Sequence, residues 1–90
     1  MEYLWETPSE IDKALATRVK AIRKRKKLSQ VELAERCNVS YGSLKKFEQT
    51  GEISLKALTK IAMELGIVNE LKQLFTEVPY NSIEEVINEK

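Results

Sequence analysis

The amino-acid sequence predicts an all-α fold of five helices, followed by a short C-terminal helical extension. Apolar residues recur every three or four positions along most of the chain, which is the period of an amphipathic helix. Serine or threonine stands directly before several of these segments, and a glutamate often follows three residues later, as in a capping box. No segment shows a convincing strand pattern, and residues 1–5 are the only candidate for an extended piece.

The length and composition indicate one small domain over residues 1–90. Of the 90 residues, 42% are hydrophobic and 32% are charged, which suits a single helical domain. Its core is expected at about residues 8–76. The N-terminal segment 1–7 and the C-terminal extension 77–90 carry further apolar residues, which either pack on each other or form dimer or partner contacts.

The composition also argues against several classes of protein. The chain has no histidine and one cysteine, Cys37, so neither a disulfide framework nor a Cys- or His-based metal site is expected. The commonest general base, histidine, is therefore absent, and no apolar run approaches the ~20 residues that span a bilayer. We expect a cytoplasmic protein without catalytic activity, cofactor, metal or membrane contact.

The first helix is predicted over residues 8–27. Thr7 is the expected N-cap, with Pro8 at the first helical position and Glu10 completing a capping box. Basic residues crowd its C-terminal end, where the helix dipole favours cations. The apolar stripe of this helix consists of Ile11, Leu15, Val19 and Ile22.

Two short helices are predicted next, over residues 30–36 and 41–49. Ser29 and Glu32 form a capping box for the first of them, and Ser40 caps the second. Asn38 lies between them and tolerates the left-handed conformation in which helices often end. The residues expected to contribute to the core are Val31, Leu33, Ala34, Leu44 and Phe47.

Two more helices and the extension complete the prediction. Ser54 caps a helix over residues 55–65, which Gly66 ends, and Asn69 caps a fifth helix. The inner residues of these two helices are Leu55, Leu58, Ile61, Ala62, Leu65, Leu71, Leu74 and Phe75. A last capping box, Ser82 to Glu85, begins the extension, with Val86 and Ile87 on one side.

Positive charge is concentrated in the middle of the chain. The net charge is only +1, but residues 13–60 carry thirteen basic and four acidic residues, while residues 1–12 and 61–90 each have a net charge of −4. Seven of the ten residues from Arg18 to Lys27 are Lys or Arg. Such a run is either a solvated helix face or a surface for a polyanion, and the charge distribution favours nucleic acid.

The two short helices have the spacing of a helix-turn-helix motif. The turn between them has only three or four residues, and in this motif the second helix enters the major groove of DNA. The groove is about 12 Å wide and admits one α-helix.

A set of residues in fixed order over about residues 15–68 resembles a known family. Its members are Arg23, Leu28, Ser29, Gln30, Leu33, Ala34, Val39, Ser40, Leu44, Phe47, Glu48, Leu55, Leu58, Ile61, Ala62, Leu65 and Gly66. They resemble the Cro/C1-type (XRE) helix-turn-helix domain, which implies a lambda-repressor-like fold and binding to double-stranded DNA. Two departures are Asn38, where the family usually has glycine, and a slightly shorter loop after Glu48.

The resemblance implies roles for individual residues. Base contacts would come from Tyr41, Gly42, Ser43 and Lys46. Phosphate contacts would come from Ser29, Gln30, Lys24, Lys26, Lys27, Lys45, Gln49 and Thr50, although each lysine could also be a solvated charge. Arg23 and Glu48 would form an internal salt bridge that orients the second helix of the motif.

The expected function is that of a sequence-specific regulator, a repressor that binds a palindromic operator as a homodimer; a restriction–modification controller is a variant of this role. A narrower similarity, over Ser43 to Leu55 and around Phe75, Tyr80 and Val86, is to HipB-like regulators. It implies an alternative, an antitoxin that binds a kinase toxin and autoregulates its operon.

Overall fold

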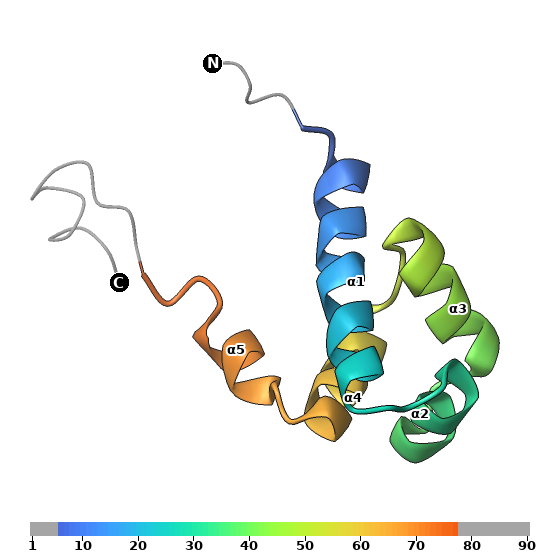
Figure 1. Ribbon diagram of the computed structural model, residues 1–90. Coiled ribbons are helices and arrows are strands. Elements are labelled where there is room, and N and C mark those ends of the chain that lie inside the picture. The colour runs from blue at the N-terminus through green and yellow to red at the C-terminus, as the bar shows by residue number, and fades with distance from the viewer. Residues whose placement is uncertain (1–5, 78–90) are drawn as a thin grey trace, which may run out of the picture.

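The computed structural model describes residues 6–77, and all regular structure in that part of the chain is helical. The five helices are α1 (Pro8–Arg25), α2 (Gln30–Cys37), α3 (Tyr41–Thr50), α4 (Leu55–Leu65) and α5 (Val68–Gln73). The strongest packing is between α1 and α3; α2 contacts both α3 and α4, and α5 packs on α4 (Figure 1). The predicted all-α, five-helix fold is confirmed, whereas the C-terminal extension and residues 1–5 lie outside the described residues.

The first four helices begin where the capping residues predicted. Thr7 Oγ1 accepts a hydrogen bond from the Glu10 backbone N–H at 3.1 Å, and the Glu10 carboxylate accepts one from the Thr7 N–H at 2.9 Å. Ser29 and Glu32 make the same reciprocal pair at the start of α2. These bonds satisfy backbone donors that a helix start leaves unpaired.

Three helices end in a left-handed residue. Asn38 ends α2 with φ 57° and Gly66 ends α4 with φ 78°, as predicted. Gly51 ends α3 with φ 87°, and a Cβ atom built on it would lie 2.6 Å from the backbone carbon of Asp12. The C-terminus of α3 therefore meets the backbone of α1 so closely that no side chain fits between them.

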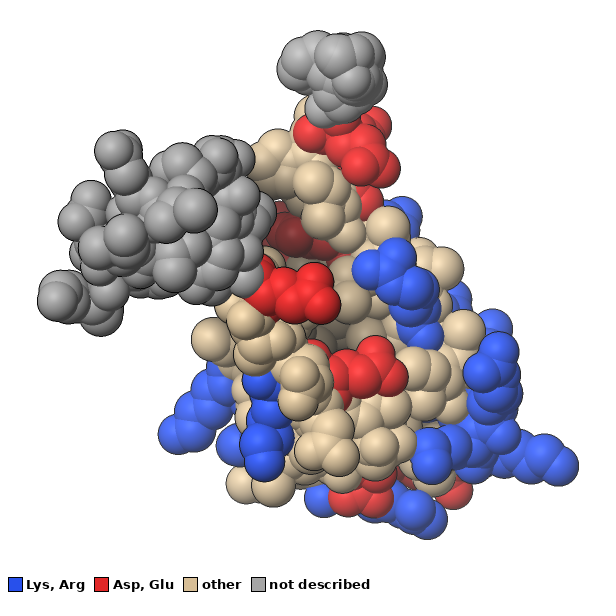
Figure 2. Space-filling model, turned by 90° about the vertical axis from the view of Figure 1, so that its left-hand side faces the viewer, with Lys and Arg blue, Asp and Glu red and all other residues tan. Residues whose placement is uncertain are grey.

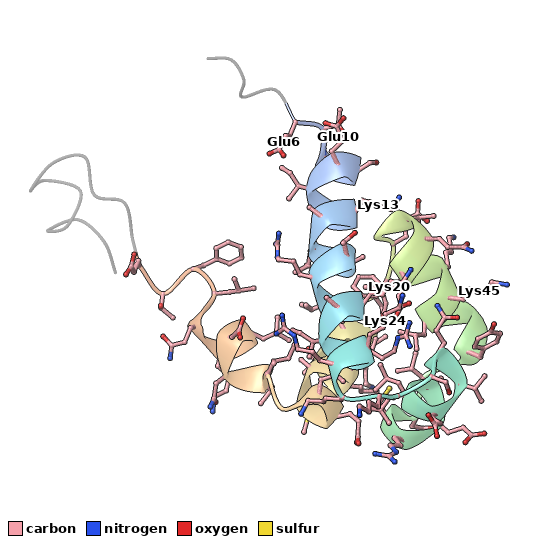
Figure 3. The ribbon with its side chains drawn as sticks, viewed as in Figure 1. Glu6, Glu10, Lys13, Lys20, Lys24 and Lys45 are labelled. Carbon is pink, nitrogen blue, oxygen red and sulfur yellow. The ribbon has the colours of Figure 1, made fainter. Side chains whose placement is uncertain are left out.

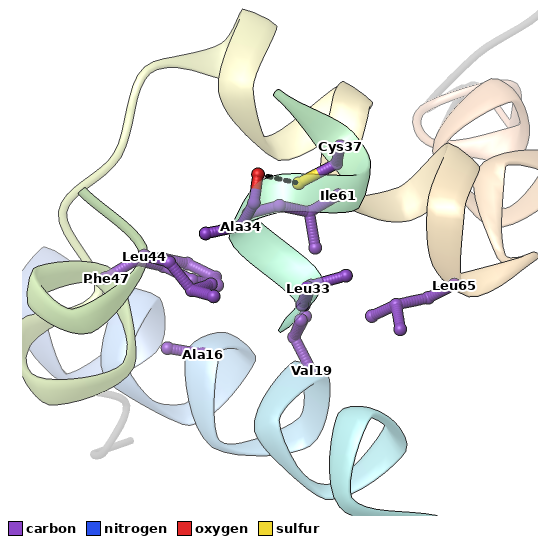
Figure 4. Packing of buried hydrophobic residues seen from close by; sticks show 9 residues of the cluster. All are labelled: Ala16, Val19, Leu33, Ala34, Cys37, Leu44, Phe47, Ile61 and Leu65. Carbon is purple, nitrogen blue, oxygen red and sulfur yellow. Dashed lines mark hydrogen bonds between the residues drawn. The ribbon is translucent and has the colours of Figure 1, made fainter. Parts of the chain in front are cut away.

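The core lies where α1, α2, α3 and α4 converge. Figure 4 shows its nine clustered side chains, which are Ala16, Val19, Leu33, Ala34, Cys37, Leu44, Phe47, Ile61 and Leu65. Burial raises the pKa of the Cys37 thiol, whose Sγ makes a weak 3.9 Å hydrogen bond to the Ala34 carbonyl. This cysteine fills space in the core.

The predicted apolar stripe of α1 is only partly correct. Val19 is buried, but Ile11 is 52% and Leu15 is 37% exposed. The face that packs inward instead contains Ala16, Val19 and Arg23. Ala16 is completely buried, one helical turn after Asp12, whose backbone Gly51 of α3 approaches.

Four further residues assigned to the core or to an inner helix face are exposed. Two of them, Leu74 (53% exposed) and Phe75 (92% exposed), come after the end of α5 at Gln73. Val31 is 48% exposed because the buried face of α2 carries Leu33, Ala34 and Cys37, and Val31 lies at the margin of that face. Leu55, in the first turn of α4, is 72% exposed, and nothing in the described part of the chain covers it.

Two helix boundaries also differ from the prediction by more than one residue. The first helix ends at Arg25 rather than residue 27, since Lys27 has a φ of 61°. The fifth begins at Val68 without a side-chain cap, so the prediction of Asn69 as its N-cap is wrong. The partly buried Ile67 donates its N–H to the Ala62 carbonyl and packs on the core, which leads the chain directly into α5.

Candidate nucleic-acid interface

The outer face of α3 is exposed. Leu44, Phe47 and Glu48 fix the other face of this helix inside the domain. The four residues predicted to contact bases are all exposed, and they lie on the first two turns of α3; they are Tyr41, Gly42, Ser43 and Lys46. The turn before α3 is held by the Val39 N–H, which donates to the Ala34 carbonyl at 3.0 Å.

Gly42 has no structural requirement inside the domain. A Cβ atom at this position would meet no other atom within 4 Å, and its φ is not in the left-handed region. Glycine is unfavourable in a helix relative to alanine. Packing within the described chain therefore does not explain the glycine, whereas close approach by an external ligand would.

Polar groups near the start of α3 leave donors free. The Ser40 hydroxyl caps the helix by accepting from the Ser43 N–H at 3.0 Å and itself donates to Ser43 Oγ at 2.8 Å. The Ser43 hydroxyl proton is therefore available to an external acceptor. Lys45 Nζ lies 5.9 Å from the ring centre of Tyr41, and both side chains remain at the surface.

Lys46 has a partner that sequence reasoning did not identify. Its Nζ lies 3.0 Å from Glu52 Oε1, and the two side chains are 63% and 67% exposed. Glu52 follows the reversal at Gly51, and its N–H donates to Thr50 Oγ1 at 3.1 Å. The reversal brings the acid back beside the outer face of α3.

Arg23 and Glu48 form the buried ion pair that the resemblance implied. Arg23 Nε donates to Glu48 Oε2 at 2.7 Å and its Nη2 donates to Oε1 at 3.0 Å, which makes a bidentate contact. Arg23 Nη1 also donates to the Leu28 carbonyl at 2.6 Å. Arg23 is thus directed into the domain and ties the end of α1 to α3.

The carboxylate of Glu48 is strongly stabilised in its charged form. Desolvation alone would raise its pKa, but hydrogen bonds from Arg23 and Gln30, and the charges of Arg23 and Lys20, outweigh burial and lower the pKa below its usual value. Lys20 was not among the predicted residues, although its position three residues before Arg23 on one helix face could have indicated it.

The predicted phosphate contacts at the start of α2 are partly engaged within the domain. Gln30 Nε2 donates to Glu48 Oε1 at 2.8 Å, which leaves one amide hydrogen for another acceptor. The Ser29 hydroxyl accepts from the Glu32 N–H and keeps its own proton. Lys24, Lys26 and Lys27 are exposed at the end of α1, directly before this capped start.

The two phosphate contacts predicted at the end of α3 lie beside α1. Gln49 and Thr50 line a surface hollow with Ser9, Lys13 and Ala14 of α1. The Thr50 hydroxyl donates to the Lys46 carbonyl at 2.8 Å and accepts from the Glu52 N–H. Its proton is therefore used inside the chain, and a phosphate contact by this hydroxyl would require that bond to break.

Charges are segregated over the surface. Glu6 and Glu10 lie at the start of α1, Lys13, Lys20 and Lys24 follow along the same helix, and Lys45 projects from α3 (Figure 3). The face on the α5 side, away from α3, carries a group of acids, with basic side chains mainly along its margins (Figure 2).

The short α2, the tight turn and an exposed α3 on a four-helix core define a lambda-repressor-like helix-turn-helix domain. Residues 19–70, more than half of the chain, match the helix-turn-helix family, and the chain belongs to this Cro/C1-type family of DNA-binding regulators. A search of curated proteins found no match. Within residues 6–77, no helix has the length and hydrophobicity needed to cross a bilayer.

Proposed function

We propose that the protein is a repressor that binds a palindromic double-stranded operator as a homodimer and reads its sequence with α3. The observation that supports this most is the contrast between the two faces of α3. The inner face is held by a buried bidentate ion pair, while the outer face presents exposed polar groups in its first two turns. A helix fixed in this way suits direct readout in a major groove.

The outward residues differ in the contacts that they can make. Lys46 donates to guanine O6 or N7, and Ser43 offers its free hydroxyl proton to a base acceptor. Tyr41 packs its ring on a thymine methyl group or donates its hydroxyl to a phosphate. Gly42 allows the backbone of α3 to approach the bases closely, which agrees with the open space around its Cα.

Phosphate contacts surround this reading surface. The exposed Lys24, Lys26, Lys27 and Lys45 neutralise phosphates, and Ser29 and Gln30 place the start of α2 against a phosphate oxygen. Gln49 and Thr50 remain weaker candidates, because both lie beside α1 and the Thr50 proton is engaged. Since each neutralised phosphate releases counterions, binding is steeply salt-dependent.

The two-fold dimer follows from how this motif reads DNA. Dimers of helix-turn-helix proteins place two recognition helices about one helical turn apart on the same side of the duplex, so the operator is palindromic. The segments proposed for the dimer or partner contacts, 1–7 and 77–90, lie almost wholly outside the described residues. Repression follows if the operator overlaps a promoter.

The test is selection of bound fragments from a random DNA library, followed by binding titrations of the selected site at two salt concentrations. We expect a palindromic motif and an affinity that falls steeply with salt. Lys46→Met should weaken binding of the selected site, whereas Lys72→Met, the same charge change on α5, should have little effect. Binding without any sequence preference, or without salt dependence, would contradict the proposal.

The alternative, a HipB-like antitoxin, stays a prediction that rests on sequence similarity alone. A gene for a kinase-like toxin beside this one, and co-purification of its product with this chain, would favour it. The two roles are compatible, because an antitoxin of this kind also binds its own operator.

A further inference from the structure

Glu52 is an acid within the surface assigned to DNA contact. It lies two residues after the end of α3, and its neighbours in a shallow hollow include Ser43 and Lys46, both proposed to contact bases. An acid at this place opposes the approach of phosphates. Its position therefore requires either a compensating contact with DNA or a cost in affinity.

The loop holds Glu52 in a defined place. Thr50 Oγ1 donates to the Lys46 carbonyl at 2.8 Å and accepts from the Glu52 N–H at 3.1 Å, so one hydroxyl joins the end of α3 to the loop. Gly51 reverses the chain between them with a φ of 87°. The backbone of Glu52 is thus fixed relative to Lys46.

The pair that results contributes little to folding. Both side chains are about two-thirds exposed, with 3.0 Å between Lys46 Nζ and Glu52 Oε1. Exposed ion pairs with a single contact are typically worth only about 0–1 kcal/mol. The Lys46 ammonium and the Glu52 carboxylate can therefore separate, and each can bind a polar group on a ligand instead.

We propose that Lys46 and Glu52 together read one G·C base pair in the major groove, an inference that rests on the proposed DNA binding by α3. The Lys46 ammonium donates to guanine O6 or N7, and the Glu52 carboxylate accepts from the N4 amino group of the paired cytosine. A G·C pair presents an acceptor and a donor next to each other on this edge, and the protein pair presents a donor beside an acceptor. An A·T pair also offers a donor, adenine N6, beside an acceptor, but only guanine presents two neighbouring acceptors, O6 and N7, to the ammonium. The two groups together therefore favour a G·C pair in one orientation.

The test compares library selections for the wild type, Glu52→Ala, Glu52→Gln and Glu70→Ala. Glu70 is an exposed acid on α5, so Glu70→Ala makes the same charge change away from α3. We expect the wild type to prefer one G·C pair per half-site by about 5- to 10-fold over the other base pairs. Glu52→Ala should reduce this preference to about twofold or less and tighten binding to random DNA, since Lys46 can then neutralise a phosphate.

Glu52→Gln should keep an intermediate preference, because its amide oxygen still accepts from cytosine N4 while the charge is lost. Glu70→Ala should keep the wild-type motif. Thermal melts of all variants should agree closely, and Glu52→Gln serves as the readout if Glu52→Ala fails to fold.

Three outcomes distinguish failure of the proposed function from failure of the inference about Lys46 and Glu52. If the wild type selects no motif, the proposed function fails, and this inference with it. If the wild type selects a motif that lacks a fixed G·C pair, or if Glu52→Ala keeps the full preference, only the inference is overturned. Tighter binding by Glu52→Ala with an unchanged motif also overturns it, since Glu52 would then act only by repelling phosphate.

Discussion

The two ion pairs of α3 differ in almost every property. Glu48, on the inner face, is buried, is held in two bonds by Arg23 and receives a third from Gln30. Lys46, on the outer face, makes one exposed contact with Glu52. One short helix can thus carry one ion pair that sets its orientation and a second ion pair that is free to exchange partners.

Glu48→Ala should produce the largest loss of stability. It leaves the Arg23 guanidinium buried without its carboxylate, which costs about 3–5 kcal/mol. The free energy of unfolding from urea titration measures this loss. Replacing both residues, Arg23→Met with Glu48→Leu, should recover much of it, because no unpaired charge remains. Wild-type stability in Glu48→Ala would show that the inner pair is no different from the outer one.

Gly51→Ala tests the backbone contact that places the inner face of α3 on α1. The substitution combines a left-handed φ with a clash at 2.6 Å, and we expect a loss of about 2–5 kcal/mol in unfolding free energy. Gly66→Ala is the matched control, because its φ is also left-handed but its Cβ would meet no atom within 4 Å. The control should lose only about 1–2 kcal/mol. Equal losses would mean that the close approach of α3 to α1 is not needed.

Acid should weaken the inner pair selectively. The pKa of Glu48 is lowered in the folded chain, so its contribution to stability is complete above the unfolded-state value of about 4.3 and is lost as pH falls through the folded pKa. Melting temperatures measured from pH 7 to pH 2.5 should therefore fall more steeply below about pH 4.3 for the wild type than for the double variant Arg23→Met, Glu48→Leu. Parallel curves would contradict a special role for Glu48 in acid unfolding.

Gly42→Ala should have the smallest effect on stability and the opposite sign. An added methyl group meets open space, so the folded state should gain up to about 1 kcal/mol from better helix propensity. Affinity for the selected operator should nevertheless fall, because in the proposed complex the methyl group would enter the space of the DNA. A more stable variant with unchanged affinity would show that the outer face does not approach DNA closely at Gly42.

Local signals made most of the fold predictable. Thr7 with Glu10, and Ser29 with Glu32, are caps whose partners are three residues away, and they marked helix starts correctly. The exposure of Ile11 and Leu15 was not predictable from periodicity, because the pattern does not say which face of α1 a distant helix will cover.

In the candidate site, too, some features follow from the local sequence and others depend on how distant parts of the chain pack. The apolar Leu44 and Phe47 indicated the inner face of α3, and the resemblance to the family added the buried Glu48 to it. The bonds of Gln30 to Glu48 and of Lys46 to Glu52 depend instead on how two helices pack and on the reversal at Gly51. Sequence spacing alone does not encode these geometries.

The buried network beneath α3 has a consequence for redesign. Arg23, Gln30 and Glu48 hold the helix from residues that face inward or belong to other helices. Residues on the outward face of α3 can therefore be substituted without changing how this helix packs in the domain. Substitutions on this face could give the domain a new operator preference. Related chains could likewise differ in their target sites while they keep the same fold.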